Sequence, residues 1–155
     1  MKYKFKELIC IFFLVVFVLV ISAQTYTTYK SASEIGESLI DILDVELIYE
    51  QDENDFEDEF SFSFDEFDSV IYYSCDEVMS VQELLIVKLN DTGDTDALVA
   101  SIEEKVSQQI DLFDNYADTQ ADLLKNAIIE TKGNFVFYCV GENAQACYDE
   151  FKIIV

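Results

Sequence analysis

The stretch from Ser31 to Val87 constrains this chain most, because its 57 residues include 18 acidic and no basic side chains. No ion pair within the stretch can offset the repulsion between its own carboxylates. Apolar residues nevertheless make up 51% of the chain, too many for a disordered acidic protein. We therefore expect a folded domain in which bound cations or lysines from elsewhere compensate the charge. Five lysines lie after Val87 and could do so: Lys88, Lys105, Lys125, Lys132 and Lys152.

Charge and composition exclude several classes of function. The 155 residues carry 32 acidic side chains against nine lysines, a net charge of −23, and contain no histidine, arginine, proline or tryptophan. Phosphate backbones and anionic membrane surfaces are bound through basic side chains, so no nucleic acid is expected as a partner. Hydrolysis through a histidine base is excluded, and the four isolated glycines build no phosphate-binding or dinucleotide fingerprint. The length fits one domain.

The N-terminus has the layout of an export signal. Lys2, Lys4 and Lys6 precede an apolar run at 8–21, and small residues end the run at Ala23. The lysines hold the N-terminus in the cytoplasm, so the rest of the chain is carried outward. Cleavage after Ala23 would give a secreted protein, whereas retention of 8–23 would anchor it to the outer face of the cytoplasmic membrane. We predict an exported protein that meets the membrane only through residues 1–30.

Hydrophobic periodicity predicts the elements of the exported part. Ser31 and Glu34 have the spacing of a capping box, which begins a helix that ends near Tyr49. The strongest helical pattern repeats apolar residues every three or four positions from Leu98 to Phe113. The other expected elements are strands at 69–75, 83–89 and 135–140, a helix at 119–130 that Asp118 caps and Gly133 closes, and a helix at 143–151.

These elements predict a single acidic α+β domain over residues 31–155. The first two strands are close in the sequence and are expected to pair antiparallel. Residues 135–140 are apolar throughout, which indicates a strand buried on both faces and central in the sheet. The predicted fold is a small three-stranded, mostly antiparallel sheet packed by about four helices, with a hydrophobic export helix before it.

Residues 50–68 combine ten acidic side chains with five phenylalanines, a composition too charged for a core and too aromatic for an ordinary linker. We interpret them as an acidic Phe-rich loop, partly docked through its rings. Aromatic rings beside carboxylates suit a cationic partner, so Phe56, Phe60, Phe62 and Phe64 form the candidate contact surface. The alternative is a solubilising loop whose phenylalanines are tucked against the domain.

Three short motifs carry a resemblance to a known family. They are the segment 82–88 (QELLIVK), Tyr116 with Gln120 four residues on, and the segment 133–136 (GNFV). In this order and spacing the chain resembles a family of small exported proteins of Gram-positive anaerobes, catalogued as domain of unknown function 4358, over most of residues 35–155. The family pattern has a proline where this chain has Asp118, which affects the corner between two helices. The resemblance implies no activity, and the matching positions Glu83, Tyr116, Gln120 and Gly133 have no known role.

The sequence predicts no catalytic residue, cofactor or defined metal site. Calcium suits clustered carboxylates, but neither the segment 52–59 nor the group Asp91, Asp94 and Asp96 fits an EF-hand loop. With 32 acidic residues in the chain, the presence of two carboxylates does not indicate a catalytic acid–base pair. Glu83 is the carboxylate of most interest, because it precedes a buried strand, and a structural role is expected for it.

The cysteines leave two alternatives open. Cys75, Cys139 and Cys147 follow the export segment, and this odd number leaves one thiol over whatever bonds form. Cys139 and Cys147 are eight residues apart, on an expected strand and the helix after it. They form either a disulfide outside the cell or a pair of buried free thiols.

These observations favour a non-enzymatic envelope or secreted protein that acts by interaction. Its expected partner is an envelope or extracellular protein of cationic character, bound at residues 50–68. The alternative is a sensor or enzyme that binds a divalent cation through carboxylates.

Overall fold

The computed structural model describes residues 11–16, 30–46, 48–77, 79–90 and 95–155. A five-stranded antiparallel sheet has the order β1-β2-β3-β5-β4. The strands are β1 (Ile48–Glu50), β2 (Phe67–Cys75), β3 (Glu83–Leu89), β4 (Ile128–Lys132) and β5 (Phe135–Val140). The helices are α2 (Ala32–Leu43), α3 (Glu53–Phe60), α4 (Thr95–Phe113), α5 (Asp118–Lys125) and α6 (Ala144–Ile154), with a 3₁₀ turn η1 at Phe64–Glu66.

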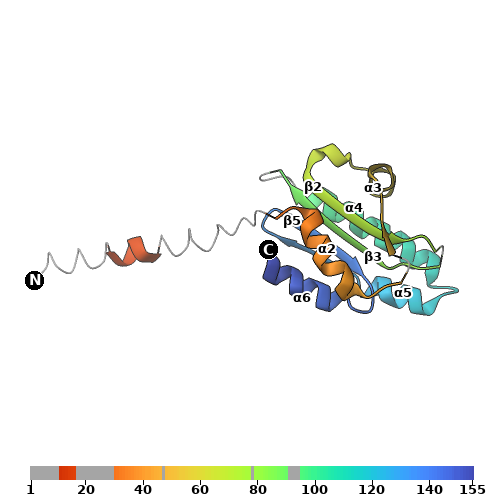
Figure 1. Cartoon of the computed structure of the whole chain (residues 1–155). Helices are drawn as coiled ribbons and strands as arrows, with labels where there is room; N and C mark the ends of the chain where they lie inside the picture. Colours follow the sequence, from red (N-terminus) through yellow and green to blue (C-terminus); the bar gives the residue numbers. More distant parts are fainter. Residues whose placement is uncertain (1–10, 17–29, 47, 78, 91–94) are drawn as a thin grey trace, which may run out of the picture.

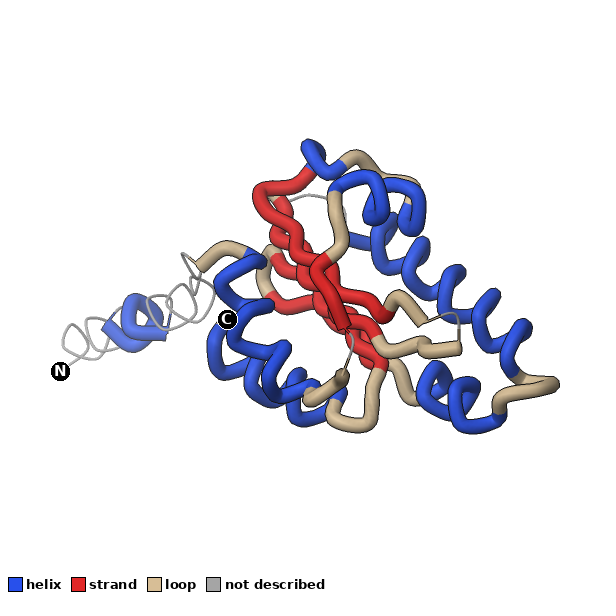
Figure 2. Tube along the Cα trace, turned by 45° about the vertical axis from the view of Figure 1, so that its right-hand side comes forward, coloured by secondary structure: helices blue, strands red, loops and turns tan. Residues whose placement is uncertain are grey.

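Helices cover both faces of the sheet, as Figures 1 and 2 show. Helices α2 and α6 pack on one face, against a set of inward side chains that includes Ile71, Ile86 and Phe137. Helices α3, α4 and α5 pack on the other face, which presents Tyr72 and Tyr138 among others. Successive side chains of a strand point to opposite faces, so β2, β3 and β5 each supply both cores. The sheet is therefore the middle layer of three.

The strands predicted at 69–75, 83–89 and 135–140 are confirmed as β2, β3 and β5, although β2 begins earlier, at Phe67, and the middle strand of the sheet is β3 rather than β5. β2 and β3 pair antiparallel, with Val70 opposite Val87. All six residues of β5 are buried, and the strand lies between β3 and β4. The α+β class is confirmed, but the expected three strands are five, because β1 and β4 were not predicted. Both are short edge strands with half-buried or exposed side chains, so neither has the apolar run of a central strand.

Helix α2 begins where the capping box predicts and ends earlier than expected. The Ser31 hydroxyl accepts from the Glu34 amide, and the Glu34 carboxylate accepts from the Ser31 amide at 2.9 Å. The helix ends at Leu43, and Asp44 has a left-handed backbone with φ of 52°. The expected end near Tyr49 is wrong, because Tyr49 lies in β1 and pairs with β2.

The helix expected at 119–130 is also shorter than predicted. It begins at Asp118, which is its first residue and not its cap, and ends at Lys125. The residues from Ile128 then form β4, where β-branched side chains favour an extended backbone and β5 supplies the pairing. Gly133 closes no helix; it occupies the turn between β4 and β5 with φ of +61°.

The export segment falls largely on residues 1–10 and 17–29, which lie outside the described part of the chain. Residues 11–16 are helical. No helix in the described ranges is both long enough and apolar enough to cross a membrane. Export, cleavage and anchoring stay predictions from the sequence.

The left-handed backbone at Gly133 makes a first prediction. Gly133→Ala should lower the free energy of unfolding by about 1–2 kcal/mol, because a Cβ is disfavoured at positive φ. Nothing lies within 4 Å of the added Cβ, so packing does not contribute. Gly133→Asn should cost clearly less, because asparagine tolerates this conformation. Urea unfolding of the full chain measures both, and equal costs for the two variants would contradict the conformational explanation.

Candidate functional site

Helix α3 presents acidic side chains on a helix that is anchored by two buried rings. Six of its eight residues are exposed, and the two that are not, Phe56 and Phe60, have no exposed area. The interpretation of 50–68 as a loop is therefore wrong. The segment contains α3, η1 and the first residues of β2. Phe56 and Phe60 belong to the core, so they are not part of a contact surface.

The remaining phenylalanines of the segment extend this anchor. The Phe64 ring lies edge-on to Phe56, with centroids 5.9 Å apart, and Phe62 lies 6.0 Å from Phe67. Phe62 and Phe64 are half-buried. The rings are thus tucked against the domain, as the alternative interpretation expected, while the carboxylates stay outside. A contact role for Phe62 and Phe64 stays a prediction.

Local hydrogen bonds define the start of α3. The Asp52 carboxylate accepts from the backbone amides of Asn54 and Asp55 at 2.8 and 3.0 Å. The Asp55 carboxylate accepts in turn from the Asp52 amide at 3.2 Å, which completes a capping box. Hydrogen bonds from Asp55 and Asn54 hold the pKa of Asp52 below its ordinary value. Further along, the Ser101 hydroxyl of α4 donates to the Phe60 carbonyl at 2.8 Å.

A buried ion pair lies beneath α3. Lys105 of α4 and Glu83 of β3 are 7% and 6% exposed, and they are the buried charged residues of the described chain. The Lys105 Nζ lies 2.5 Å from Glu83 Oε2 and 3.1 Å from Glu59 Oε1. Lys105 therefore joins three elements, α4, β3 and α3. Sequence reasoning selected Glu83 and missed its partner, although Lys105 follows Ile102 by three positions and so faces inward.

Aromatic side chains surround this pair. The Lys105 Nζ lies 4.8 Å from the ring centroid of Phe60, 5.5 Å from Tyr72 and 5.7 Å from Tyr138. The Tyr72 hydroxyl donates to Glu83 Oε1 at 3.2 Å. Burial, and then the nearby Glu83 carboxylate, raise the pKa values of Tyr72 and Tyr138 well above the ordinary value. Both hydroxyls stay protonated, and the low exposure of the pair favours the structural role expected for Glu83.

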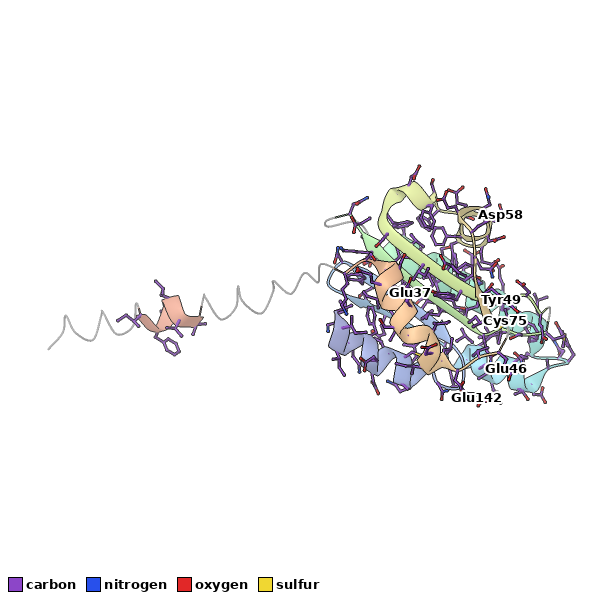
Figure 3. The ribbon with its side chains drawn as sticks, in the orientation of Figure 1. Glu37, Glu46, Tyr49, Asp58, Cys75 and Glu142 are labelled. Carbon is purple, nitrogen blue, oxygen red and sulfur yellow. The ribbon has the colours of Figure 1, made fainter. Side chains whose placement is uncertain are left out.

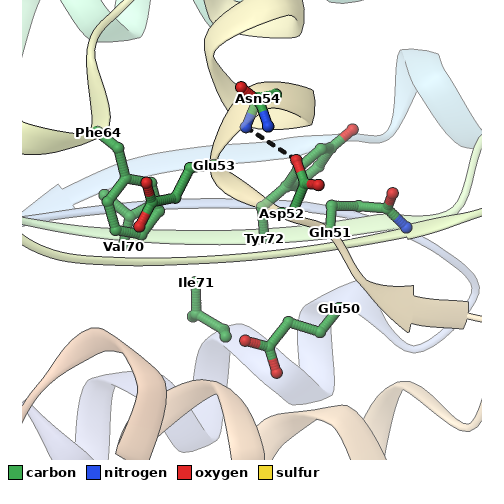
Figure 4. A pocket seen from close by; sticks show the side chains of 9 residues that line it. All are labelled: Glu50, Gln51, Asp52, Glu53, Asn54, Phe64, Val70, Ile71 and Tyr72. Atoms are coloured by element: carbon green, nitrogen blue, oxygen red, sulfur yellow. Dashed lines mark hydrogen bonds between the residues drawn. The ribbon is translucent and has the colours of Figure 1, made fainter.

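Two pockets border α3. One, of about 400 Å³, lies between α3 and α4 and is lined by Asp58, Glu59 and Glu104, with Lys105 among the other residues. Figure 3 places Asp58 on α3 at the surface of the domain. The second, of about 430 Å³, lies where β1 gives way to α3, with Glu50 and Glu53 in its wall (Figure 4). Carboxylates thus dominate the charged groups of both pockets.

The four family-matching positions do not form one site. Tyr116 is 61% exposed and packs its ring 5.4 Å from that of Phe113. The Gln120 side chain accepts from the Val81 amide at 3.2 Å, which ties α5 to the segment before β3. Glu83 pairs with Val140 at one end of β5, whereas the Gly133 turn precedes the other end. The structure therefore separates Gly133 from Glu83 by the length of the strand.

Metal-binding groups and thiols give no further centre in the ranges described. No three carboxylates or cysteines there lie close enough together to hold a metal ion, and Asp91 and Asp94 lie outside those ranges. Cys75, Cys139 and Cys147 are free thiols. A hydrogen bond between the buried thiols of Cys139 and Cys147 raises the pKa of the first and lowers that of the second.

The buried ion pair makes a second prediction. Lys105→Met should lower the free energy of unfolding by about 3–5 kcal/mol, because it leaves Glu83 buried without a countercharge. Lys125→Met is the matched control, since it breaks the exposed Lys125–Asp114 pair and should cost about 1 kcal/mol or less. Urea unfolding measures both.

A double variant isolates the buried charge as the cause. Lys105→Met with Glu83→Leu should recover much of the loss, because no charge is then left inside. Equal losses for Lys105→Met and Lys125→Met would show that the ion pair has no special role.

Comparisons with known proteins give a family and nothing further. The model of the family described as Domain of unknown function (DUF4358) matches residues 41–141, which is more than half of the chain. No curated protein and no solved structure shows significant similarity to the chain.

Proposed function

Because the chain belongs to the DUF4358 family, whose description states no activity, we propose a function from its geometry. The protein is an exported, non-enzymatic interaction domain of the cell envelope or the secreted fraction. Its acidic α3 surface, defined here as the exposed carboxylates of α3 with Glu104 of α4, binds a cationic partner protein.

The exposure pattern of α3 is the observation that carries this proposal. Five of its eight residues are acidic and exposed, while both phenylalanines are in the core. Among the described residues, Lys105 is the one cation within ion-pair distance of this helix, and it meets only Glu59. The helix therefore holds several carboxylates in a fixed array without neutralising them.

A fixed acidic array suits a basic protein surface. The like charges repel one another, so a partner that brings lysine or arginine side chains relieves the repulsion and gains ion pairs. The net charge of −23 adds long-range steering, which accelerates encounter with a cationic partner. Because Phe56 and Phe60 and the hydrogen bond from Ser101 hold the helix in place, little ordering entropy is lost when the partner binds.

The location of the partner follows from the N-terminal sequence. Three lysines before an apolar run direct the rest of the chain outward, so the acidic α3 surface meets partners beyond the cytoplasm. The sequence-based alternative, a divalent-cation sensor or enzyme, has no observation in its favour, since the described carboxylates form no metal-binding group.

Charge removal on one face tests the proposal. Asp58→Asn with Glu104→Gln removes two exposed carboxylates beside the α3–α4 pocket. The control, Glu37→Gln with Asp41→Asn, removes the same charge from exposed positions of α2 on the opposite face of the sheet. Each tagged full chain, in non-ionic detergent, is used to capture proteins from the envelope fraction of the producing cell.

The two variants should differ in what they retain. A basic protein that the wild-type chain captures, and that salt releases, should be lost from the first variant and kept by the control. Equal capture by both variants would contradict a role for the acidic α3 surface. Weakening by about threefold to tenfold is expected for two exposed charge pairs.

A further inference from the structure

Strand β2 is longer than the strand that covers its outer edge. β1 pairs with Tyr73–Cys75, and the last backbone bond on this side runs from the Gln51 amide to the Tyr72 carbonyl at 2.8 Å. β2 itself begins at Phe67, and its inner edge pairs with β3 along its length apart from an irregularity between Phe67 and Ser69. In the described chain, no strand lies beside the outer edge of β2 before Tyr72.

The alternation of an antiparallel strand identifies the backbone groups at this open edge. The amide and carbonyl of one residue point to the same edge, and the next residue points to the opposite one. Because the Tyr72 carbonyl faces β1, the amide and carbonyl of Val70 face the same outer edge. A second hydrogen bond, from the Leu89 amide to the Asn134 carbonyl, supports this orientation. It shows that the backbone groups of Leu89 and Val87 in β3 face β5, so those of Lys88 and Ile86 face β2. Val87, which is opposite Val70, therefore does not pair with the Val70 backbone.

Val70 therefore has unpaired backbone groups, in a residue that is only 4% exposed when its buried side chain is included. No hydrogen bond joins its amide or carbonyl to another described residue. Strand edges without a partner invite pairing with another extended backbone, because they present a row of free amides and carbonyls. Here they lie at a pocket of about 430 Å³ whose lining includes Val70, Ile71 and Tyr72. An extended backbone beside Val70 would satisfy both groups.

Two carboxylates flank this edge on opposite sides of the sheet. Figure 4 shows Glu53 beside Phe64 and Val70 above the β2 ribbon, and Glu50 beside Ile71 below it. The register agrees, since Glu50 is opposite Tyr73, which faces the same core as Ile71. Side chains of a bound strand would alternate between these two sides every residue, or every 3.3 Å or so.

We propose that the open edge of β2 at Val70 binds an extended, basic peptide segment of a partner protein by strand addition. The segment's backbone pairs with the amide and carbonyl of Val70. One basic side chain meets Glu53, and a neighbouring one meets Glu50 on the other side of the sheet. This inference rests on the proposed function in taking the partner to be cationic, and it adds the place and manner of binding.

Charge decides between a partner and a second copy of this chain as the occupant. The edge strand of a second copy would bring its own Glu50 and Asp52 against the same carboxylates. The described lysines offer no free basic strand, since four of them are in ion pairs, Lys132 donates to the Lys152 carbonyl, and Lys30 lies outside the strands. A basic segment from another protein has neither drawback.

Amide hydrogen exchange provides the direct test. The probe is the peptide acetyl-Val-Lys-Lys-Lys-Val-amide, added to the full-length chain in non-ionic detergent micelles and followed by NMR. Saturating peptide should slow exchange of the Val70 amide by about tenfold, as expected for one added hydrogen bond. The Ile71 amide should change little, because it already bonds to β3. Equal changes at Val70 and Ile71, or no change at Val70, would overturn strand addition.

Peptide variants separate backbone pairing from charge attraction. N-methylation removes one peptide amide, and moving the methyl group along the three lysines should weaken binding strongly at alternate positions only. Glu50→Gln with Glu53→Gln should lower the affinity for the probe by about fivefold. The α2 control, Glu37→Gln with Asp41→Asn, should lower it by much less. An N-methyl effect without alternation, or equal effects of the two double variants, would overturn the inference.

The outcomes also separate this inference from the proposed function. If the probe binds but without alternation or protection of Val70, strand addition fails while a cationic partner still stands. If the chain binds neither this probe nor any basic protein in the capture experiment, the proposed function fails. Protection of Val70 in the free chain that disappears on dilution would identify a second copy as the occupant and would also overturn the inference.

Discussion

The Lys105 ammonium is the group on which the arrangement of this domain depends. It lies 2.5 Å from Glu83 and 3.1 Å from Glu59, and so joins the central strand, the long helix and the acidic helix at one point. The stretch from Ser31 to Val87 has no cation of its own, and in the described structure Lys105 and Lys88 are the lysines that form ion pairs with it. A buried ion pair is costly to desolvate, and an aromatic lining with a second carboxylate offsets part of that cost.

The position of Lys105 has a consequence for α3. The charge of its five carboxylates does not favour packing of α3 against the acidic domain. Two fully buried phenylalanines contribute about 3–6 kcal/mol to its docking, which exceeds the few tenths of a kcal/mol that each exposed like-charge pair costs. Phe60 also covers the ion pair, since its ring centroid lies 4.8 Å from the Lys105 Nζ. Burial of these two rings therefore keeps the acidic helix packed on the domain despite the repulsion between its carboxylates.

Sequence reasoning predicted the parts of the fold that have strong local signals. The capping box of Ser31, the apolar strand at 135–140 and the long helix ending at Phe113 were found because each signal lies within a few residues. β1 and β4 were missed because pairing with distant strands, rather than their own pattern, makes them extended. Helix α3 was missed because only two apolar residues, Phe56 and Phe60, mark its inner face.

The candidate site was predictable to a similar extent. The concentration of acids at 50–68 was evident from composition, whereas the burial of Phe56 and Phe60 required the fold, since exposed and docked rings have the same sequence. The spacing of Lys105 three residues after Ile102 places it on the inner face of α4, but the buried carboxylate that it meets comes from β3, which no local pattern of the helix indicates. The open edge at Val70 depends on where β1 stops, which no local pattern of β2 indicates.

The capping box of α3 connects the acidic helix with the open strand edge. Asp52 accepts from the amides of Asn54 and Asp55, and this geometry turns the chain out of the sheet immediately after Gln51. If the chain stayed extended, residues 52–54 would continue along β2 and cover Val70. By starting a helix there, the chain loses strand pairing at Val70 and gains a cap, typically about 1 kcal/mol. The acidic helix and the unpaired edge thus have the same cause, the turn of the chain into α3 after Gln51. A ligand that contacts both would bind at this one turn.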